Sequence, residues 1–351
     1  MFTRELFDKA MLFYGAKIYR KFYSEQIIGL RLSDGSDAYI SVMGSSSGYI
    51  SLAVYPGEEG LHSLLRLVKN LKGEDGILSG LTQHSVQCVF EPRNEMPDES
   101  YRAVNGLLKQ LNITVTDRTI LPSFSRYEPF RLDCPGRQED YRMLEEAFDA
   151  VLYLDRLDKK GQFSIAALPQ LKSYSGSRLA YMVKDGDGYR LSAIETQPFD
   201  ESMLPEAELP EEAILQQAAA LPVSPLENFD VSLAFVSPIA DKDSCSRIVP
   251  QLLLCLNRHT GKLLHLDIGK DDVWSLEYQL EVLVKRMLKR KKKPAAIYTN
   301  SIFTHHLLKP LCERLEISLV FDDNLRSLTH ALFSMHQHFI IGDPAGRRGL
   351  S

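Results

Sequence analysis

The sequence predicts a protein of the α+β or α/β class, with two mixed-sheet units in which a strand meander precedes alternating helices and strands. The clearest evidence is the stretch from Asp272 to Phe339, where three amphipathic helical patterns alternate with two apolar runs typical of buried strands. A second observation is a set of three short β patterns, joined by the turn-rich links SDGSD and GSSSG, at residues 27–32, 38–43 and 49–55. The third is the length of 351 residues, which suits two domains of ordinary size.

The first unit is expected to span residues 1–160 and to open and close with helices. Residues 3–23 carry apolar side chains at helical spacing, and Thr3 suits the N-cap position. After the meander, residues 60–72 place their apolar side chains on one helical face. The remaining elements expected in this unit are a buried strand and two helices, at residues 85–91, 98–111 and 137–157.

A hairpin and a linker are expected at residues 161–229. The β patterns Leu179–Val183 and Tyr189–Ile194 flank an Asp-Gly pair, which is a strong local signal for a hairpin turn. Residues 197–228 then hold five prolines and seven acidic residues around a short Ala/Gln helix. This acidic, proline-punctuated composition predicts a linker between domains.

The second unit is expected at residues 230–351. Three strands are predicted before the helical stretch, at residues 231–236, 251–256 and 262–268. Three meandering strands followed by helix, strand, helix, strand and helix form an order that resembles the ribonuclease-H-like fold. The resemblance lies in element order alone, and it implies parallel strands joined by helical crossovers.

A local match between the two halves predicts an internal duplication of this unit. Leu307–Ile317 (LLKPLCERLEI) aligns without gaps on Ala103–Ile113 (AVNGLLKQLNI). Pro310 falls on Gly106, so both segments carry a poor helix-interior residue at the same place. We therefore expect residues 20–130 to repeat the fold of the second unit.

Two longer stretches are similar to an uncharacterised bacterial family of two-part proteins that are classed as domains of unknown function. These stretches are VMGSSSGYISLAVYPGEEGL in the first half and PAAIYTNSIFTHHLLKPLCERLEISLVF in the second. The resemblance implies a division into two domains. It implies no activity and no cofactor.

Composition excludes several function classes. The net charge of −5 and a pI near 6.0 give no global basic field that would draw the chain onto nucleic acid or anionic lipid. No apolar run reaches the ~18 residues of a membrane span, and the N-terminus does not resemble a signal peptide. The five cysteines never form C-x-x-C pairs, which favours a reduced cytoplasmic location: Cys88, Cys134, Cys245, Cys255 and Cys312.

The ribonuclease-H-like resemblance implies metal-binding carboxylates on the first strand, at the end of the fourth strand and on helices. Here the first strand is expected to read VSLAFVSP, without an acid, and Asn300 follows the fourth strand. Glu277 and Asp322 remain as acids near the expected sheet end, so Glu277, Asn300 and Asp322 are the candidate pocket residues. Glu281 is four residues before Lys285 and is expected to form a helix-surface pair. The sequence therefore predicts no catalytic residues and no bound metal.

Other motifs favour turns over catalytic or ligand sites. Gly44–Gly48 matches G-x-S-x-G, but a strand follows it instead of the helix that a nucleophile elbow needs. Lys184–Tyr189 resembles a fragment of a calcium loop and lacks its remaining ligands. A zinc site from His330, His336 and His338 with Asp343 is a weaker alternative, because the histidines lack the usual i, i+4 spacing.

One strong charge cluster ends the helix before residue 294. Cations complement the negative end of a helix dipole, but seven in nine residues exceed that need. They are candidates for contact with nucleic acid, with an acidic partner or with the chain's own acidic linker. We call them the basic run: Lys285, Arg286, Lys289, Arg290, Lys291, Lys292 and Lys293. The acidic linker residues are Glu201, Glu206, Glu208, Glu211 and Glu212.

These observations together favour a non-enzymatic protein-interaction or scaffold module whose partner is another protein. The alternative is a nucleic-acid-associated protein that uses the basic run at residues 285–293. A metal-dependent hydrolase built from residues far apart in the sequence is the weaker alternative. No cofactor is expected, because no glycine-rich nucleotide loop follows any strand.

Overall fold

A computed structural model describes residues 3–44, 49–225, 227–235, 238–240, 246–265 and 275–341. The chain divides into two compact units. Unit 1 comprises Met1–Leu71, Ser79–Met203 and Lys242–Ser246, and unit 2 comprises Lys72–Leu78, Leu204–Asp241 and Arg247–Ser351. Helices and mixed sheets occur throughout, which confirms the predicted α+β or α/β class.

The first part of the chain holds five α-helices in the described residues up to 203: α1 (Arg4–Gly15), α2 (Gly57–Val68), α3 (Gly73–Leu81), α4 (Asp98–Gln110) and α5 (Gln138–Lys159). The strands in the same part are β1 (Ile28–Arg31), β2 (Asp37–Met43), β3 (Ile50–Pro56), β4 (Ser85–Pro92), β5 (Ile120–Glu128), β6 (Arg131–Cys134), β7 (Ser177–Asp185) and β8 (Gly188–Thr196).

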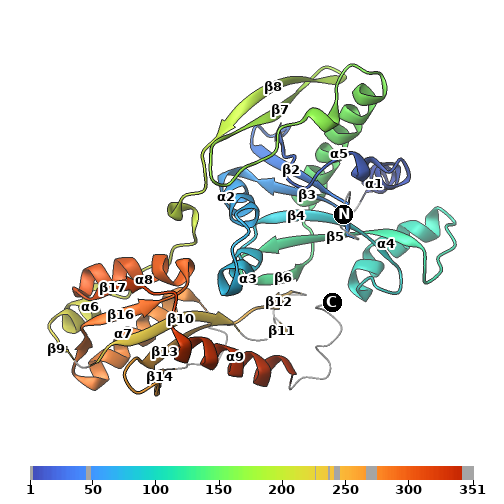
Figure 1. Cartoon of the computed structure of the whole chain (residues 1–351). Helices are drawn as coiled ribbons and strands as arrows, with labels where there is room; N and C mark the ends of the chain where they lie inside the picture. Colours follow the sequence, from blue (N-terminus) through green and yellow to red (C-terminus); the bar gives the residue numbers. More distant parts are fainter. Residues whose placement is uncertain are drawn as a thin grey trace. The chain divides into compact units, whose positions relative to one another are not determined.

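The sheet of unit 1 has the strand order β6-β5-β4-β3-β2-β1-β7-β8 (Figure 1). Strands β1 to β6 pair as an antiparallel meander, and β7 and β8 form an antiparallel hairpin. The hairpin joins the sheet through β7, which pairs in parallel with β1. It therefore belongs to the first sheet and not to the linker in which it was predicted. We infer that the connecting segment is limited to the acidic stretch after Met203.

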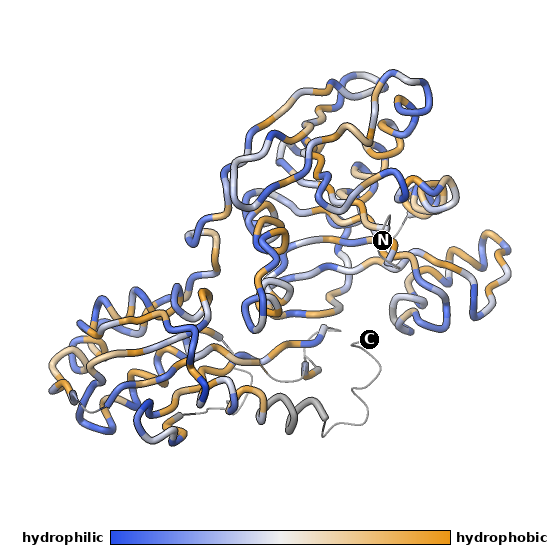
Figure 2. The backbone as a smooth tube through the Cα atoms, in the orientation of Figure 1, coloured by the Kyte–Doolittle hydropathy of each residue, from blue (hydrophilic) through white to orange (hydrophobic). Residues whose placement is uncertain are grey.

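Two apolar cores cover the faces of this sheet. On one face, α1 and α5 pack against the strands through fully buried aromatic residues such as Phe13 and Phe148, whose rings make an edge contact at 5.5 Å. On the other face, α2 packs Leu64 and Leu65 against Tyr55 and its neighbours. Hydrophilic and hydrophobic residues alternate along α2 because only one side of the helix is buried (Figure 2).

Some elements before residue 135 were not predicted. No helix or strand was predicted between residues 112 and 136, but β5 and β6 form there, and β5 pairs along its length with β4. Helix α3 replaces an expected polar loop. Both segments have mixed composition without a clear period, so their structure depends on the neighbouring strand or helix more than on local pattern.

In the described residues after 203 the α-helices are α6 (Glu212–Ala219), α7 (Leu276–Arg290), α8 (Ile302–Leu315) and α9 (Arg326–Ile341). The strands are β9 (Val223–Ser224), β10 (Phe229–Phe235), β11 (Ile239–Ala240), β12 (Arg247–Ile248), β13 (Gln251–Asn257), β14 (Leu263–His265), β15 (Lys293–Pro294), β16 (Ala296–Thr299) and β17 (Ser318–Phe321).

The main sheet of unit 2 has the strand order β14-β13-β10-β16-β17. Its first three strands are antiparallel, and β10, β16 and β17 run parallel. Helix α9 packs Leu328 and Leu332 on the face that holds Ala234 and Leu254. The buried residues Leu280 of α7 and Leu308 of α8 belong to the helices that precede β16 and β17.

The two sheets differ in topology. In unit 2 the strand after the first long helix, β16, pairs in parallel with the first strand, β10. In unit 1 the corresponding strand, β4, pairs antiparallel with β3. The short match between the α4 and α8 regions therefore reflects two helices with a similar apolar pattern, against the predicted duplication of one unit.

Candidate functional site

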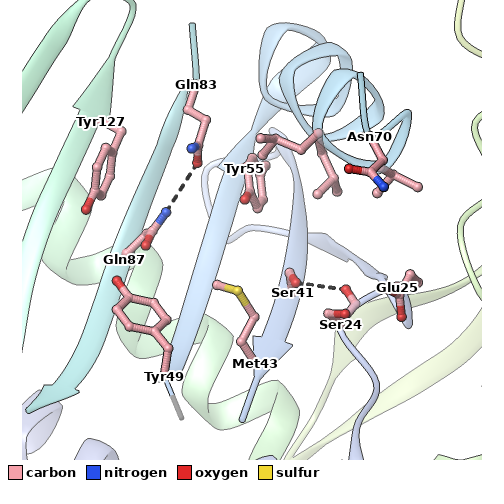
Figure 3. A pocket seen from close by; sticks show the side chains of 13 residues that line it. Ser24, Glu25, Ser41, Met43, Tyr49, Tyr55, Asn70, Gln83, Gln87 and Tyr127 are labelled. Carbon is pink, nitrogen blue, oxygen red and sulfur yellow. Dashed lines mark hydrogen bonds between the residues drawn. The ribbon is translucent and has the colours of Figure 1, made fainter. Parts of the chain in front are cut away.

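The candidate site is a pocket of about 560 Å³ in unit 1, between α2 and the sheet (Figure 3). Strands β2 to β5, the segment before β1 and the end of α2 supply its walls. Hydroxyl, amide and apolar side chains share the lining: Ser24, Glu25, Ser41, Met43, Tyr49, Tyr55, Leu64, Leu67, Val68, Asn70, Gln83, Gln87 and Tyr127.

Strand alternation explains why polar residues reach this pocket. On β2, Ile40 and Val42 enter the core beneath α1 and α5, so Ser41 between them points to the opposite face. On β4, Gln87 stands between the core residues Val86 and Cys88 in the same way. The sequence analysis interpreted this strand as simply buried. A period-two alternation of apolar and polar residues was the signal that it missed.

Two glutamine amides meet in the pocket. The Nε2 of Gln87 donates to the Oε1 of Gln83 at 3.4 Å, as Figure 3 shows, and to the Oγ of Ser85 at 3.3 Å. Among the described residues, the Oε1 of Gln87 and the Nε2 of Gln83 have no hydrogen-bond partner. The pair therefore leaves one acceptor and one donor at the wall of the pocket.

Three tyrosines contribute hydroxyl groups and ring surfaces. Burial raises the pKa of Tyr49, although 45% of this residue is exposed, and its hydrogen bond with Tyr127 raises it further. Burial also raises the pKa of Tyr55. Because an unperturbed tyrosine already titrates near pH ~10, both hydroxyls stay protonated at neutral pH and can donate hydrogen bonds.

The polar part of the described lining consists of amides, hydroxyls and a carboxylate. Within the described lining there is no histidine, cysteine, lysine or arginine, and Glu25 is the single carboxylate. The Oγ of Ser41 donates to the backbone oxygen of Ser24 at 3.1 Å. The arrangement is suited to binding an uncharged polar group.

Unit 2 holds a separate charged cluster, Asp230–Arg258–Asp322. The guanidinium of Arg258 donates to the Oδ1 of Asp230 at 2.9 Å and to the Oδ2 of Asp322 at 2.7 Å. The same guanidinium lies 3.8 Å from the ring centre of Tyr298. Burial raises the pKa of Asp230 while Arg258 opposes the shift. The backbone N–H of Asn324 and Arg258 lower the pKa of Asp322.

Asp230 was missed by the sequence analysis. The first strand was expected to start at Val231 and to contain no acid, but β10 starts at Phe229 and includes Asp230. That expectation was wrong because the boundary was placed where the apolar run begins. Asp230 is 4% exposed and pairs in register with Tyr298 of β16, so it is part of the sheet.

No hydrogen bond or ion pair links the three candidate pocket residues to one another in the described part of the chain. Asp322 lies beside the end of β16 through its backbone N–H, which donates to Thr299 at 2.9 Å, and its side chain pairs with Arg258. Asn300 is half-buried after β16. Glu277 lies on α7, and in the described part of the chain it makes no hydrogen bond or ion pair with either residue.

The N-terminus of α8, next to Asn300, is occupied by a carboxylate within unit 2. Asp75 accepts from the hydroxyl of Ser301 at 2.6 Å and from the backbone N–H of Ile302 at 3.0 Å. A carboxylate at this position satisfies unpaired backbone donors and complements the helix dipole. No local sequence pattern indicates this contact, because Asp75 and Ser301 are far apart in the chain.

Most of the basic run has intramolecular partners. Lys285 pairs with Glu281, as expected for an i, i+4 pair, and Arg286 donates to the backbone oxygen of Leu264 at 2.6 Å. Arg290 and Lys292 both contact the Oε1 of Glu227, at 2.6 and 2.7 Å.

The remaining members of the run divide into one buried and two exposed lysines. Lys293 is 4% exposed and donates to the backbone oxygens of Ala219 and Leu315, at 2.9 and 2.7 Å. Lys289 and Lys291 are exposed, and no described residue pairs with their ammonium groups.

The acidic partners of the run differ from those expected. Glu227, just before β10, forms ion pairs with two of the cations, whereas Glu212 pairs with Arg314 on α8. Glu211 contributes a longer-range attraction to Lys285. In the described residues, no ion pair joins the run to the five linker glutamates named above, and its glutamate partners are Glu227 and Glu281.

Several other predicted features lie outside the described residues or carry no cluster. The loop Ser45–Gly48, the side chains of His336 and His338, and Asp343 are not described. Across the residues that are described, no group of three or more His, Cys, Asp or Glu side chains is placed to hold a metal ion. None of the described helices combines the length and apolar character needed to cross a membrane.

These features define a two-part α/β protein with a neutral pocket in one part and an arginine-bridged carboxylate pair in the other. Two family models match the chain: a domain of unknown function, DUF7309, over residues 4–166, and a second domain of unknown function, DUF6930, over residues 215–336. The two models cover the chain in two parts, which matches the uncharacterised two-part family that its sequence resembles. No curated protein and no solved structure matches it.

Proposed function

We propose that the protein is a non-enzymatic interaction module that binds an uncharged polar group in the pocket of unit 1. The observation that supports this most strongly is the chemistry of the lining, in which amides and protonated hydroxyls surround an apolar wall. Small-molecule sites commonly combine such a wall with a few orienting polar groups, in volumes of roughly 300–1,000 Å³.

The charged cluster of unit 2 supports a role without phosphodiester cleavage. The strand order β14-β13-β10-β16-β17 is that expected of a ribonuclease-H-like unit, and we infer this fold for residues 230–340. In an active member of that fold, carboxylates at the sheet end would hold metal ions. Here the positive charge between Asp230 and Asp322 comes from Arg258, which cannot activate water.

The alternative of a nucleic-acid-associated protein is supported by fewer available cations than the sequence suggested. Five of the seven cations in the basic run are engaged within the chain, which leaves Lys289 and Lys291 for phosphate contact. Contact with about two phosphates gives weak binding with a shallow salt dependence. We therefore place nucleic acid second to a protein or small-molecule partner.

A cytoplasmic location is part of the proposal. Cys88, Cys134, Cys255 and Cys312 are buried free thiols, and burial raises the pKa of each. Thiols of this kind act as small core residues and suit a reducing compartment.

The proposal is tested by thermal denaturation of the full chain with two neutral probes, uridine and a blocked glutamine dipeptide. We expect at least one probe to raise the melting temperature of the wild type, but not of Gln87→Leu, because a ligand that binds only the native state stabilises it. Tyr23→Phe, which alters an exposed tyrosine outside the pocket, is the matched control.

A hydrolase assay completes the test. The chromogenic phosphodiester bis(p-nitrophenyl) phosphate is incubated with the protein and Mg²⁺ or Mn²⁺. We expect no metal-dependent hydrolysis above the background. Hydrolysis that requires the metal and disappears in Asp230→Asn would overturn the non-enzymatic proposal in favour of the hydrolase alternative.

A further inference from the structure

We propose that the pocket of unit 1 recognises a nucleobase, presented as a free base or a nucleoside. The ligand class is a neutral planar heterocycle that carries a hydrogen-bond donor beside an acceptor on one edge. This inference rests on the proposed function, because it names the group that the binding module would take.

The two glutamines can form hydrogen bonds with one edge of the heterocycle. Gln87 Nε2 is engaged with Gln83 Oε1 and with Ser85, so the pair offers the Oε1 of Gln87 as an acceptor and the Nε2 of Gln83 as a donor. A base edge with N–H next to C=O satisfies both atoms at once. A ligand with two acceptors, or with a blocked N–H, would leave the Gln87 oxygen unpaired, which is costly because this residue is 5% exposed.

The rest of the lining suits a flat ring. Tyr55 and Tyr127 supply aromatic surface, and Leu64, Leu67 and Val68 at the C-terminal part of α2 supply an apolar wall. Bases stack on aromatic side chains with little dependence on sequence. The polar ends of the tyrosines remain protonated, so the pocket presents no negative charge from them to a neutral ring.

The charge of the pocket lining favours a nucleoside over a nucleotide. The described lining contains no cationic side chain, and its one ionisable carboxylate, Glu25, would repel a phosphate. A ribose could donate its hydroxyls to Glu25, Ser24 or Asn70 at the same end of the pocket. We therefore infer that an uncharged nucleoside binds more tightly than its 5′-monophosphate.

The test is isothermal titration of the full chain with uridine, 3-methyluridine and uridine 5′-monophosphate. We expect uridine to bind, and 3-methyluridine to bind about tenfold or more weakly, because one methyl group removes the N–H donor. The monophosphate should also bind about tenfold more weakly. Gln87→Leu should abolish the preference for uridine over 3-methyluridine, while Tyr23→Phe should leave all three affinities unchanged.

The outcomes separate this inference from the proposed function. Equal binding of uridine and 3-methyluridine, or tighter binding of the monophosphate, would overturn the nucleobase assignment. If the blocked glutamine dipeptide binds and uridine does not, the interaction module stands and the nucleobase inference fails. If no neutral probe binds the wild-type chain, both fail.

Discussion

At the scale of single residues, Arg258 is the side chain on which the chemistry of unit 2 depends most. It balances two carboxylates, and one of them, Asp230, is 4% exposed. A buried carboxylate without a partner destabilises a protein by more free energy than an exposed ion pair contributes to its stability. The arginine is therefore a structural cation between two carboxylates.

Replacement of Arg258 by alanine should destabilise the protein by about 2 kcal/mol, because it leaves the Asp230 carboxylate buried and unpaired. Urea denaturation followed by circular dichroism measures the change. Arg314→Ala is the matched control, since it removes an arginine from an exposed pair with Glu212 and should cause no measurable loss. Equal stability of both variants would contradict this role for Arg258.

Acid should weaken the Asp322 contacts. The pKa of Asp322 is lower in the folded protein than its ordinary value. The contribution of Asp322 to stability is therefore present above the unfolded pKa of about 3.9, and it is lost as the pH falls through the folded pKa. Asp322→Asn should therefore flatten the decline of the urea midpoint below about pH 4. Midpoints measured from pH 2 to 6 for the wild type and the variant check this, and parallel curves would refute it.

At the scale of elements, two helix ends carry backbone strain that glycine would relieve. Lys291 ends α7 with φ 57° and Glu316 ends α8 with φ 55°, both in the left-handed region. Side chains with a Cβ disfavour this region, whereas glycine enters it freely.

We expect Lys291→Gly and Glu316→Gly each to raise the free energy of unfolding by about 0.5–1 kcal/mol. Chemical denaturation of the full chain measures the gain. Ala220→Gly is the control, because Ala220 ends α6 with φ −73° and glycine there should destabilise. A loss of stability in both left-handed variants would show that their side chains contribute more than the strain costs.

The elements that the sequence predicted well share a clear period or a turn motif. The alternating helices and strands from α7 to α9 and the β7–β8 hairpin carry such signals and are present. By contrast, β5 depends on its pairing with β4, and Asp230 lies outside the apolar run that marked β10. To predict the pocket, one must know which face of the sheet α2 covers. The pattern of a single strand does not contain that information.

At the scale of the whole molecule, the protein is acidic, so any attraction to nucleic acid would be weak and would come from the basic run. The net charge is −5, and three of the seven cations in the basic run form ion pairs with glutamates. Lys293 belongs to the interior, so its replacement would test folding and not binding. Any retention should depend on Lys289 and Lys291.

Retention on a single-stranded DNA column at low salt should be slight, and it should vanish in the double variant Lys289→Ala, Lys291→Ala. Two phosphate contacts predict a logarithmic salt slope of about −1.4 for a single strand. Lys309→Ala, an exposed lysine on α8 outside the run, should elute as the wild type does. A much steeper slope, or retention that survives the double change, would contradict this assignment.

The parallel pairing of β1 with β7 has a consequence for synthesis on the ribosome. Ile28 is matched with Ala180, so one side of β1 finds its partner only after more than half of the chain has emerged. Until then the meander carries an open strand edge, the kind of surface that invites pairing with other nascent chains. Completion of the hairpin covers that edge. A ribosome that pauses before residue 177 would prolong the time during which the edge can pair with other chains.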